Sequence, residues 1–354
     1  MSTTFRLATF NCENLYGRPT IFGENKDTSM KLLEKVKELQ NELTKETFDH
    51  DKIKTLENEL KGYVTVNDIR GKHTTAEGVK EWFGWIEFSR QTPNEGSVLN
   101  TARVIHEVDA DIICPIEVEN RISLERFHDQ LLWKEFLKPN KKPRYEYIML
   151  VDGNDDRGID VSIMSRFPIN WIRSHINDKT MYFGKETKTF SRDCLEAQIT
   201  LPSKETIFLL VNHLKSLAYN KGPDRLGNIR RLGQTERIAE IADEHNLDLE
   251  LLAIVGDMNA PADNESLKPL LEKDGLYNVN LELDSDKRGT YRTGKKQLDY
   301  IIVSNALKDK LSQVYIERRG VFTTTKNWVP FDTVKDCKTE ASDHAVVVAD
   351  FKID

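Results

Sequence analysis

The sequence predicts an α/β fold in which helices cover sheets. Short apolar runs end at polar residues, as in strands that are buried on both faces. Segments with apolar residues at helical spacing separate several of these runs, so that helices and strands alternate. The polar residues follow the earlier runs and precede the last two. This reversal fits antiparallel neighbours whose polar ends share one edge of a sheet.

The composition is that of a soluble protein with a substantial core. Of the 354 residues, 38% are hydrophobic and 31% are charged, and the formal net charge is −7. A net negative charge argues against a protein that coats nucleic acid non-specifically. A local basic patch with bound divalent metal would still permit a catalytic encounter with nucleic acid. The four cysteines form no CxxC pair, which argues against a zinc ribbon or a disulfide framework. No apolar run is long enough for a bilayer and residues 1–11 lack a secretory pattern, so we expect a cytoplasmic protein without a membrane partner.

Six apolar runs carry polar residues at one end. The first four runs cover residues 5–10, 111–116, 207–211 and 251–255, and they are followed by Asn11, by Glu117, by Asn212 and His213, and by Asp257 and Asn259. In the last two runs, residues 300–304 and 345–351, the polar residues come first, as Asp299 and as Ser342, Asp343 and His344. A Gly-Asp turn after one strand is more often a plain turn than a catalytic one. The repetition along the chain is what predicts a single rim where these side chains meet.

Residues 29–61 predict a helical hairpin inserted into the fold. Apolar residues recur every three or four positions from Leu32 to Leu43 and from Ile53 to Leu60, which is typical of two amphipathic helices. With about two heptads in each arm, a local hairpin is favoured over a long coiled coil. The same spacing predicts helices over residues 97–108 and 124–137, followed by a strand over residues 145–151.

Aromatic residues are concentrated between residues 62 and 96, where Trp82, Phe83, Trp85 and Phe88 lie among lysines and arginines. Both a surface that stacks on nucleic-acid bases and a packed helix over the core fit this pattern, and the packed helix is favoured.

Two segments near the predicted rim carry a local excess of positive charge. Residues 179–192 include Lys179, Lys185, Lys188 and Arg192, and residues 215–237 include Lys221, Arg225, Arg230, Arg231 and Arg237. Such clusters can hold phosphates in an otherwise acidic protein. For the first segment, a strand edge protected by lysines is an equally good interpretation.

Seven motifs resemble the endonuclease/exonuclease/phosphatase superfamily, which includes pancreatic deoxyribonuclease, exonuclease III and the inositol polyphosphate 5-phosphatases. The motifs are TFNCENL with Asn11, IEVEN with Glu117, RGIDVSIMSRFPI, VNHLKS with His213, GDMNAP with Asp257 and Asn259, LDYIIVS with Asp299, and SDHAVV with Asp343 and His344. Each motif is weak alone, but all seven occur in the family's order. The resemblance implies a four-layer α/β/β/α sandwich of two mainly antiparallel sheets covered by helices, in a single catalytic domain over residues 1–354.

The resemblance also implies roles for individual residues. The catalytic set comprises a pair of Asp299 with His344, His213 at the scissile phosphate, and Asp257 with Asn259 at the attacking water. Glu117 is implied as the main metal ligand, with Asp343 and Asn11 in support, and Asn212, Arg192 and Asp160 are implied as substrate-binding residues. Carboxylate and amide oxygens without a thiolate suit Mg²⁺ or Mn²⁺. Whether Asp257 or His344 accepts the proton from water stays open, and Ile116 stands where the family often has Gln.

We therefore expect divalent-metal-dependent hydrolysis of phosphodiester bonds in nucleic acid. The alternative is a phosphomonoesterase of the same fold that acts on inositol phosphates, phospholipids or nucleotides. The spread of the two basic segments favours a polymer, which must be held along several phosphates. A non-catalytic scaffold that recruits a protein partner through the hairpin at residues 29–61 is a third hypothesis, and the presence of all the motif residues argues against it.

Overall fold

The computed structural model describes residues 3–15, 17, 19–45, 47–66, 86–91, 94–155, 157–217, 222–325 and 327–353. The chain divides into two compact units, one formed by Met1–Tyr16 with Asn94–Asp354 and the other by Gly17–Pro93. The aromatic cluster expected at Trp82, Phe83 and Trp85 lies outside the described residues.

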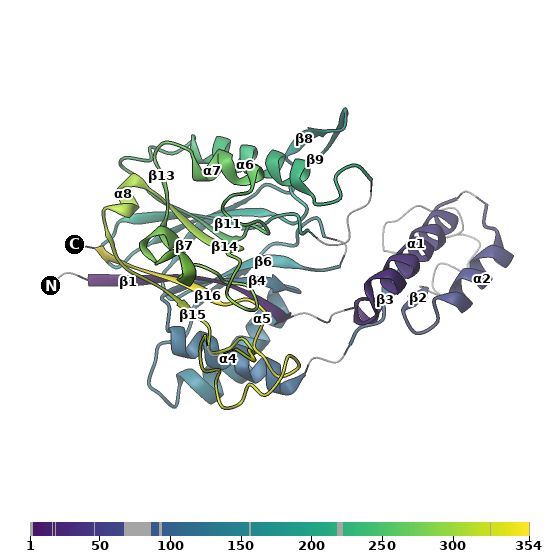
Figure 1. Ribbon diagram of the computed structural model, residues 1–354, viewed down its shortest axis with the longest axis horizontal. Helices are drawn as coiled ribbons and strands as arrows, with labels where there is room; N and C mark the ends of the chain where they lie inside the picture. The colour runs from purple at the N-terminus through teal and green to yellow at the C-terminus, as the bar shows by residue number, and fades with distance from the viewer. Residues whose placement is uncertain are drawn as a thin grey trace. The chain divides into compact units, whose positions relative to one another are not determined.

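Two six-stranded sheets form the centre of the larger unit (Figure 1). The first sheet has the order β15 (Leu311–Glu317), β16 (Val346–Ile353), β1 (Thr3–Leu15), β4 (Ile112–Val118), β6 (Asp160–Ser165) and β5 (Tyr147–Leu150). The second has the order β13 (Leu276–Asn278), β14 (Asp299–Ser304), β12 (Leu251–Asp257), β11 (Thr206–His213), β10 (Cys194–Thr200) and β7 (Ile169–Ser174). Neighbouring strands are antiparallel except for the pairs β1–β4 and β11–β12, which are parallel.

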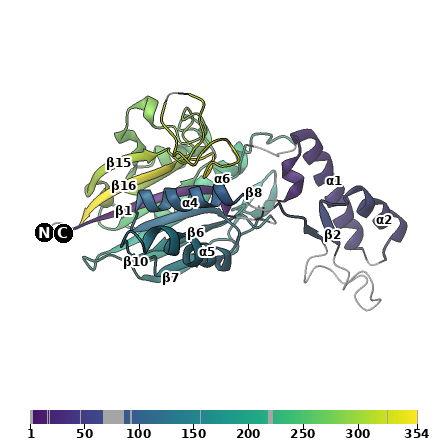
Figure 2. The same ribbon diagram turned by 90° about the horizontal axis from the view of Figure 1, so that it is seen from below.

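Helices cover the outer face of each sheet. The first sheet packs against α4 (Glu95–Val108), α5 (Arg121–Phe127) and the wider helical turns of η2 (His128–Leu137), as Figure 2 shows for α4 and α5. The second sheet packs against α6 (Asn228–Ala242) and α7 (Lys268–Leu271). The remaining short elements are β8 (Lys179–Tyr182), β9 (Lys185–Lys188), α8 (Asn305–Lys308), η3 (Glu265–Leu267), η4 (Val279–Glu282) and η5 (Ser285–Lys287).

The apolar pattern of β1 shows why the strands are buried on both faces. Phe5 and Leu7 belong to the core between the two sheets, whereas Ala8 and Phe10 belong to the core beneath the helices. Side chains of a strand alternate between the two faces, so a strand with two covered faces needs apolar residues at nearly every position. The four-layer α/β/β/α sandwich that the sequence predicts is confirmed.

The unit Gly17–Pro93 contains the two helices expected in the hairpin. They are α1 (Lys26–Leu43) and α2 (His50–Glu59), accompanied by η1 (Thr20–Gly23) and by the strand pair β2 (Val64–Val66) with β3 (Ile86–Phe88). The side chains of Asn25 and Asp49 cap the helices by accepting hydrogen bonds from the first-turn N–H groups of Thr28 and Lys52. This unit is larger than residues 29–61 because the β2–β3 pair and η1 belong to it. A protein partner on α1 and α2 stays a prediction.

None of the described helices has both the length and the apolar composition that a membrane crossing requires.

Candidate active site

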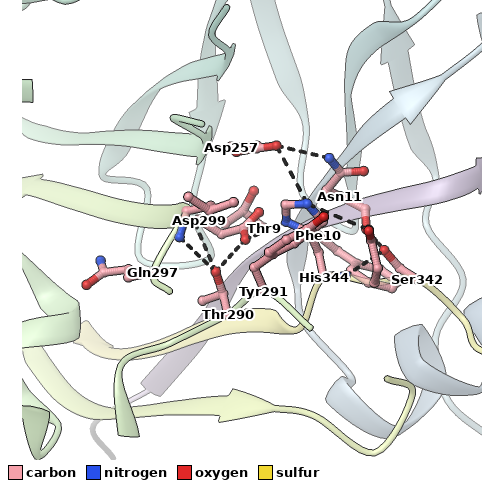
Figure 3. A network of polar contacts seen from close by, with 12 residues as sticks. Thr9, Phe10, Asn11, Asp257, Thr290, Tyr291, Gln297, Asp299, Ser342 and His344 are labelled. Atoms are coloured by element: carbon pink, nitrogen blue, oxygen red, sulfur yellow. Dashed lines mark hydrogen bonds and ion pairs between the residues drawn. The ribbon is translucent and has the colours of Figure 1, made fainter. Parts of the chain in front are cut away.

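Polar side chains from both sheets meet at one edge of the sandwich. His213 and Asp257 occupy paired positions on the parallel strands β11 and β12, and Asp257 is paired with Asp299 on the antiparallel strand β14. Asn11 of the first sheet donates from Nδ2 to Asp257 Oδ2 at 3.1 Å (Figure 3). His344 comes two residues before β16 in the first sheet and reaches the same edge. The site therefore joins the two sheets.

Asp257 is buried and held in a fixed orientation. Its Oδ1 accepts a hydrogen bond from the backbone N–H of Asn259 at 2.8 Å, and its Oδ2 accepts one from Asn259 Nδ2 at 3.2 Å. Burial raises the pKa of Asp257 to about 7, against an opposing contribution from His344 and with a further increase from the charge of Asp299. A carboxylate with this pKa can accept a proton near neutral pH.

The preceding residue, Gly256, has a φ of 133°, which L side chains rarely adopt. A Cβ atom there would lie 1.9 Å from the carbonyl oxygen of Asn212 on β11. Only glycine lets β12 approach β11 closely enough to place His213 beside Asp257.

His344 and Asp299 form a buried hydrogen-bonded pair. His344 Nδ1 lies 2.8 Å from Asp299 Oδ2, which also accepts a hydrogen bond from Thr290 Oγ1 at 2.6 Å. His344 Nε2 lies 3.9 Å from Asp257 Oδ2. Burial alone would lower the pKa of His344, but the charges of Asp299 and Asp257 outweigh it and raise the pKa well above 6.5. His344 is therefore an imidazolium near neutral pH, which donates from Nδ1 to Asp299 and keeps the N–H of Nε2 available as a second donor.

Asp257, Asp299 and His344 place three potential metal-ligating atoms within 4.8 Å of one another. However, His344 uses Nδ1 for Asp299, and an imidazolium has no lone pair for a metal. This arrangement favours proton transfer and hydrogen bonding over metal binding.

Glu117 is presented by a local irregularity of β4. Its φ is 65°, in the left-handed region, and the pairing of β4 with β6 shifts register between Ile116 and Val118. Such bulges re-aim a side chain at the end of a strand, and the strain they store is common at functional sites. The irregularity explains why Glu117 faces the rim although its neighbours are core residues.

Glu117 and Asp343 provide hard oxygen atoms on the first-sheet side of the site. Burial raises the pKa of Glu117, the charges of His344, Arg192 and Arg157 oppose that rise, and Asp343 adds to it. No described residue donates a hydrogen bond to the Glu117 carboxylate, and Nε2 of His213 lies 3.8 Å from its Oε1. Asp343 Oδ2 lies 3.2 Å from an Arg292 nitrogen. Carboxylate oxygens of this kind are the ligands that a divalent cation such as Mg²⁺ or Mn²⁺ prefers.

His213 is a neutral imidazole between these two groups of acids. Burial, together with the charges of Arg192, Arg157, His344 and Lys215, lowers its pKa well below 6.5. His213 Nε2 lies 3.6 Å from Asp257 Oδ2, and within the described part of the chain Nδ1 has no hydrogen-bond partner. A neutral imidazole here can bind a phosphate oxygen without adding to the positive charge.

The three residues expected to bind substrate lie at the margin of the site. Arg192 is buried, with Nε 2.9 Å from Asp155 Oδ2, and Asn212 Nδ2 donates to the carbonyl of Leu210 at 3.0 Å. Asp160 Oδ1 accepts a hydrogen bond from the backbone N–H of Gly153 at 2.8 Å, and burial raises its pKa to about 7. Asp160 thus fixes the loop at residues 152–155, and the structure does not bring its carboxylate among the catalytic candidates.

Sequence analysis did not identify Asp155, Arg157 and Thr290. Asp155 pairs with Arg157 at 2.7 Å as well as with Arg192. Burial alone would raise the pKa of Asp155, but these two guanidinium groups lower it to about 2. The polar loop that ends in the first residue of the RGID motif was the available signal for Asp155 and Arg157, whereas a lone threonine in a loop carries none.

Much of the positive charge predicted at the rim is not free. Lys179 pairs with Glu186 at 2.7 Å, and Arg237 pairs with Asp178 at 2.7 Å and with Glu240 at 2.9 Å. Arg231 is fully buried and donates to the backbone carbonyls of Lys215 and Leu226. Part of the positive charge of these segments is therefore compensated within the chain, and phosphate binding by them stays a prediction. Lys221 lies outside the described residues.

The fold and the acid–imidazole site define a class of phosphoester hydrolases. A model described as the endonuclease/exonuclease/phosphatase family matches residues 64–329, more than half of the chain, and the chain belongs to this family.

Solved structures with the same fold share little sequence with this chain. An endonuclease/exonuclease/phosphatase family protein from Bacteroides thetaiotaomicron has 14% identity and a TM-score of 0.53, over 100% of this chain and 99% of that one. An endonuclease/exonuclease/phosphatase from Beutenbergia cavernae has 12% identity and a TM-score of 0.53, over 99% and 72% of the two chains. Truncated Caenorhabditis elegans TDP2 has 18% identity and a TM-score of 0.47, over 73% and 90%. No curated protein matches the sequence.

Proposed function

We propose that the protein hydrolyses phosphodiester bonds in nucleic acid and that it requires a divalent cation. The observation that carries this proposal is the closeness of a proton acceptor, Asp257, to a proton donor, His344. Oδ2 of Asp257, whose pKa is about 7, lies 3.9 Å from Nε2 of the His344 imidazolium. Glu117 lies beside His213, and Asp343 lies beside His344. Membership of a family named for endonucleases, exonucleases and phosphatases supports phosphoester hydrolysis.

In the proposed reaction Asp257 accepts the proton of the attacking water. Asn259 and Asn11 hold the carboxylate through hydrogen bonds and leave it one direction of approach. Asp299 orients His344, which donates from Nε2 to an oxygen of the scissile phosphate and stabilises the charge that develops there. His213 contributes a second imidazole contact to the same phosphate.

Glu117 and Asp343 would hold Mg²⁺ or Mn²⁺, with the amide oxygen of Asn11 in support. When bound, the cation supplies positive charge that offsets the phosphate charge that would otherwise repel the incoming nucleophile. Asn11 Oδ1 accepts one hydrogen bond, from the N–H of Glu13 at 3.1 Å, which leaves its second lone pair for this role.

A nucleic acid is proposed over a small monoester because positive charge extends beyond the site. Lys215 lies near Arg192 and Arg157, and burial together with their charges lowers its pKa to about 8, so cations are gathered on this side of the site. A polymer presents phosphates on both sides of the scissile one, and such cations can hold them. Phosphomonoester hydrolysis remains the alternative.

A substrate panel tests the proposal. Duplex DNA, single-stranded DNA, RNA, inositol phosphates and nucleoside monophosphates are incubated with the protein in Mg²⁺, in Mn²⁺ and in EDTA, and Asp257→Asn serves as the inactive control. We expect turnover of a nucleic acid in Mg²⁺ or Mn²⁺ and none in EDTA. Rapid turnover of monoesters alone would establish the phosphatase alternative, and full activity in EDTA after metal stripping would overturn the metal requirement.

A further inference from the structure

A second polar pocket adjoins the candidate active site. It has a volume of about 660 Å³ and lies between the loop at residues 153–155, the base of the β8–β9 hairpin and the first turn of α6, with Asn154, Asp155, Lys188, Ser191 and Arg230 among its lining residues. Asp155 connects it to the site, because its carboxylate pairs with Arg192, whose charge acts on Glu117 and Asp257.

The two cations that line this pocket lack acidic partners. Lys188 Nζ donates to the amide oxygen of Asn154 at 2.7 Å, and Arg230 donates to Thr187 Oγ1 at 2.7 Å and to the carbonyl of Lys188. Among the residues that the structure describes, neither forms an ion pair with a carboxylate. The acid in the lining, Asp155, is already compensated by Arg157 and Arg192.

The positive charge comes from side chains and not from the end of a helix. The first N–H groups of α6, those of Ile229 and Arg230, donate to the carboxylate of Asp224 at 3.2 and 3.0 Å. The helix N-terminus is therefore already occupied by a carboxylate. Lys188 and Arg230 are left as donors that can face an anion in the pocket.

We propose that this pocket binds a second phosphate of the substrate, beside the scissile phosphate. The inference rests on the proposed function and deepens it, because it makes the enzyme selective for substrates that carry at least two phosphates. The second phosphate would be the neighbouring diester of a nucleic-acid strand or another phosphate of a small polyphosphorylated molecule. Lys188 contributes a mobile point charge, and Arg230 contributes a guanidinium that the hairpin holds in place.

The decisive variant is Lys188→Gln, and the chain offers a matched control. Lys179 lies directly opposite Lys188 in the register of β8 and β9, but its ammonium pairs with Glu186 at 2.7 Å. Lys179→Gln therefore removes the same charge from the same hairpin without touching the pocket.

Binding is measured by titration calorimetry on the full chain in EDTA, so that no turnover occurs. The probes are dithymidine monophosphate, the same dinucleotide with a 5′-phosphate, and inositol trisphosphate. We expect Lys188→Gln to raise the Kd of the ligands with additional phosphates about tenfold, as the loss of one charged hydrogen bond implies. Lys179→Gln should change the same Kd values less than twofold. Comparing the 5′-phosphorylated dinucleotide with inositol trisphosphate shows which source of the second phosphate the pocket prefers. Equal affinities for the wild type and Lys188→Gln, or no binding by either, would overturn the proposal.

Arg230→Gln provides a second variant. Because Arg230 also holds the hairpin, its Tm is measured by thermal unfolding and its affinities are compared well below that temperature, where a loss of affinity for the ligands with additional phosphates is expected. The outcomes for this pocket and for the proposed function can be told apart. If Lys188→Gln loses affinity but the wild type hydrolyses no phosphoester, the phosphate-binding pocket is supported and the proposed function is refuted. If the wild type hydrolyses phosphodiesters but Lys188→Gln keeps its affinities, the proposed function is supported and the pocket is refuted.

Discussion

Asp257 lies directly opposite Asp299 in the antiparallel register of β12 and β14, and both carboxylates are buried. One imidazole serves both, with His344 Nδ1 2.8 Å from Asp299 and Nε2 3.9 Å from Asp257. Asp299 has two close donors, His344 and Thr290, whereas Asp257 has only amide donors. This unequal hydrogen bonding explains how two neighbouring acids can take different roles, with Asp299 as the hydrogen-bonded partner of His344 and Asp257 as the proton acceptor.

The first prediction concerns this pair. Asp299→Ala and His344→Ala should each lower kcat by roughly 10²- to 10⁴-fold, because each removes the oriented imidazolium. Since the two residues act as a unit, the double variant should lose little more than the worse single variant. Steady-state kinetics with circular dichroism as a fold check measures this, and Asp286→Asn, an exposed acid on η5, is the control. Independent, multiplicative losses would contradict the pairing.

A second prediction follows from the pKa values of the two groups. Activity should rise with pH through about 7, as Asp257 loses its proton, and should fall at higher pH as His344 loses its own. The pKa of His344 is raised chiefly by Asp299 and Asp257, so Asp299→Asn should move the alkaline limb to lower pH. The profile of kcat/KM against pH tests both limbs. An alkaline limb that does not move in Asp299→Asn would show that another group titrates there.

A third prediction separates metal binding from turnover. Mn²⁺ at 100 times its Kd should stabilise the protein by about 2.7 kcal/mol, seen as a rise in Tm. Glu117→Gln and Asp343→Asn should abolish this rise, because they remove the charged oxygen ligands. Glu125 is an acid on α5 that pairs with Arg121, and the control variant Glu125→Gln should retain the rise in Tm. Retention of the full rise in both ligand variants would place the cation elsewhere.

The fourth prediction concerns stability on the other side of the second sheet. Glu196 is fully buried and lies 2.9 Å from Arg173 Nε and 3.2 Å from His175 Nε2. Burial alone would raise the pKa of Glu196 and lower that of His175, but their mutual hydrogen bond and their other charged neighbours lower the first to about 2 and raise the second.

The two shifts act at opposite ends of the pH scale. Glu196 stabilises the folded state above pH 4.5, and this stabilisation is lost as the pH falls towards 2. His175 stabilises the folded state below pH 6.5, and this stabilisation is lost as the pH rises through its raised pKa. The contribution of this pair to the free energy of unfolding should therefore be greatest between pH 4.5 and pH 6.5. Glu196→Gln should cost about 2 kcal/mol in that window and flatten the acid limb in urea titrations. An unchanged pH dependence would contradict this assignment.

The fifth prediction compares two glycines. Gly256→Ala should destabilise the protein by about 3 kcal/mol or more, because its Cβ would clash with the Asn212 carbonyl and its backbone is unsuited to alanine. Gly233 lies within α6, where a Cβ would meet Thr180 at 3.4 Å, an ordinary contact. Gly233→Ala should therefore be neutral or slightly stabilising. Urea unfolding measures both, and equal effects would contradict the contact between β11 and β12.

Helix-covered sheets could be predicted from the sequence because the strands are buried on both faces, and the four-layer arrangement followed from the family resemblance. A continuous apolar run such as residues 251–255 ends near the edge of the sheet, so the polar residues that follow it mark the rim. The reversed order at Asp299 and His344 then indicated antiparallel neighbours, and the observed pairing of β14 with β12 agrees. The order of polar residues around each strand and the direction in which the strands pair therefore agree.

The surroundings of the site could not be read in the same way. Arg231 and Arg237 look alike in the sequence, yet Arg231 is buried against backbone carbonyls and Arg237 is half-buried beside Asp178. Asp160 lies within a motif but holds a loop. Which partner a charged side chain finds depends on segments that lie far away in the chain, and a single sequence does not disclose those pairings.

The pairing of β1 with β16 has a consequence for the newly made protein. Thr3 pairs with Ile353, and Ser342 Oγ donates to the carbonyl of Asn11 across 331 residues of sequence. During translation β1 emerges before β16, so one of its hydrogen-bonding edges waits for a partner that is synthesised much later. Asn11 and His344 meet only after that partner arrives. The site therefore cannot assemble on the nascent chain before β16 has emerged.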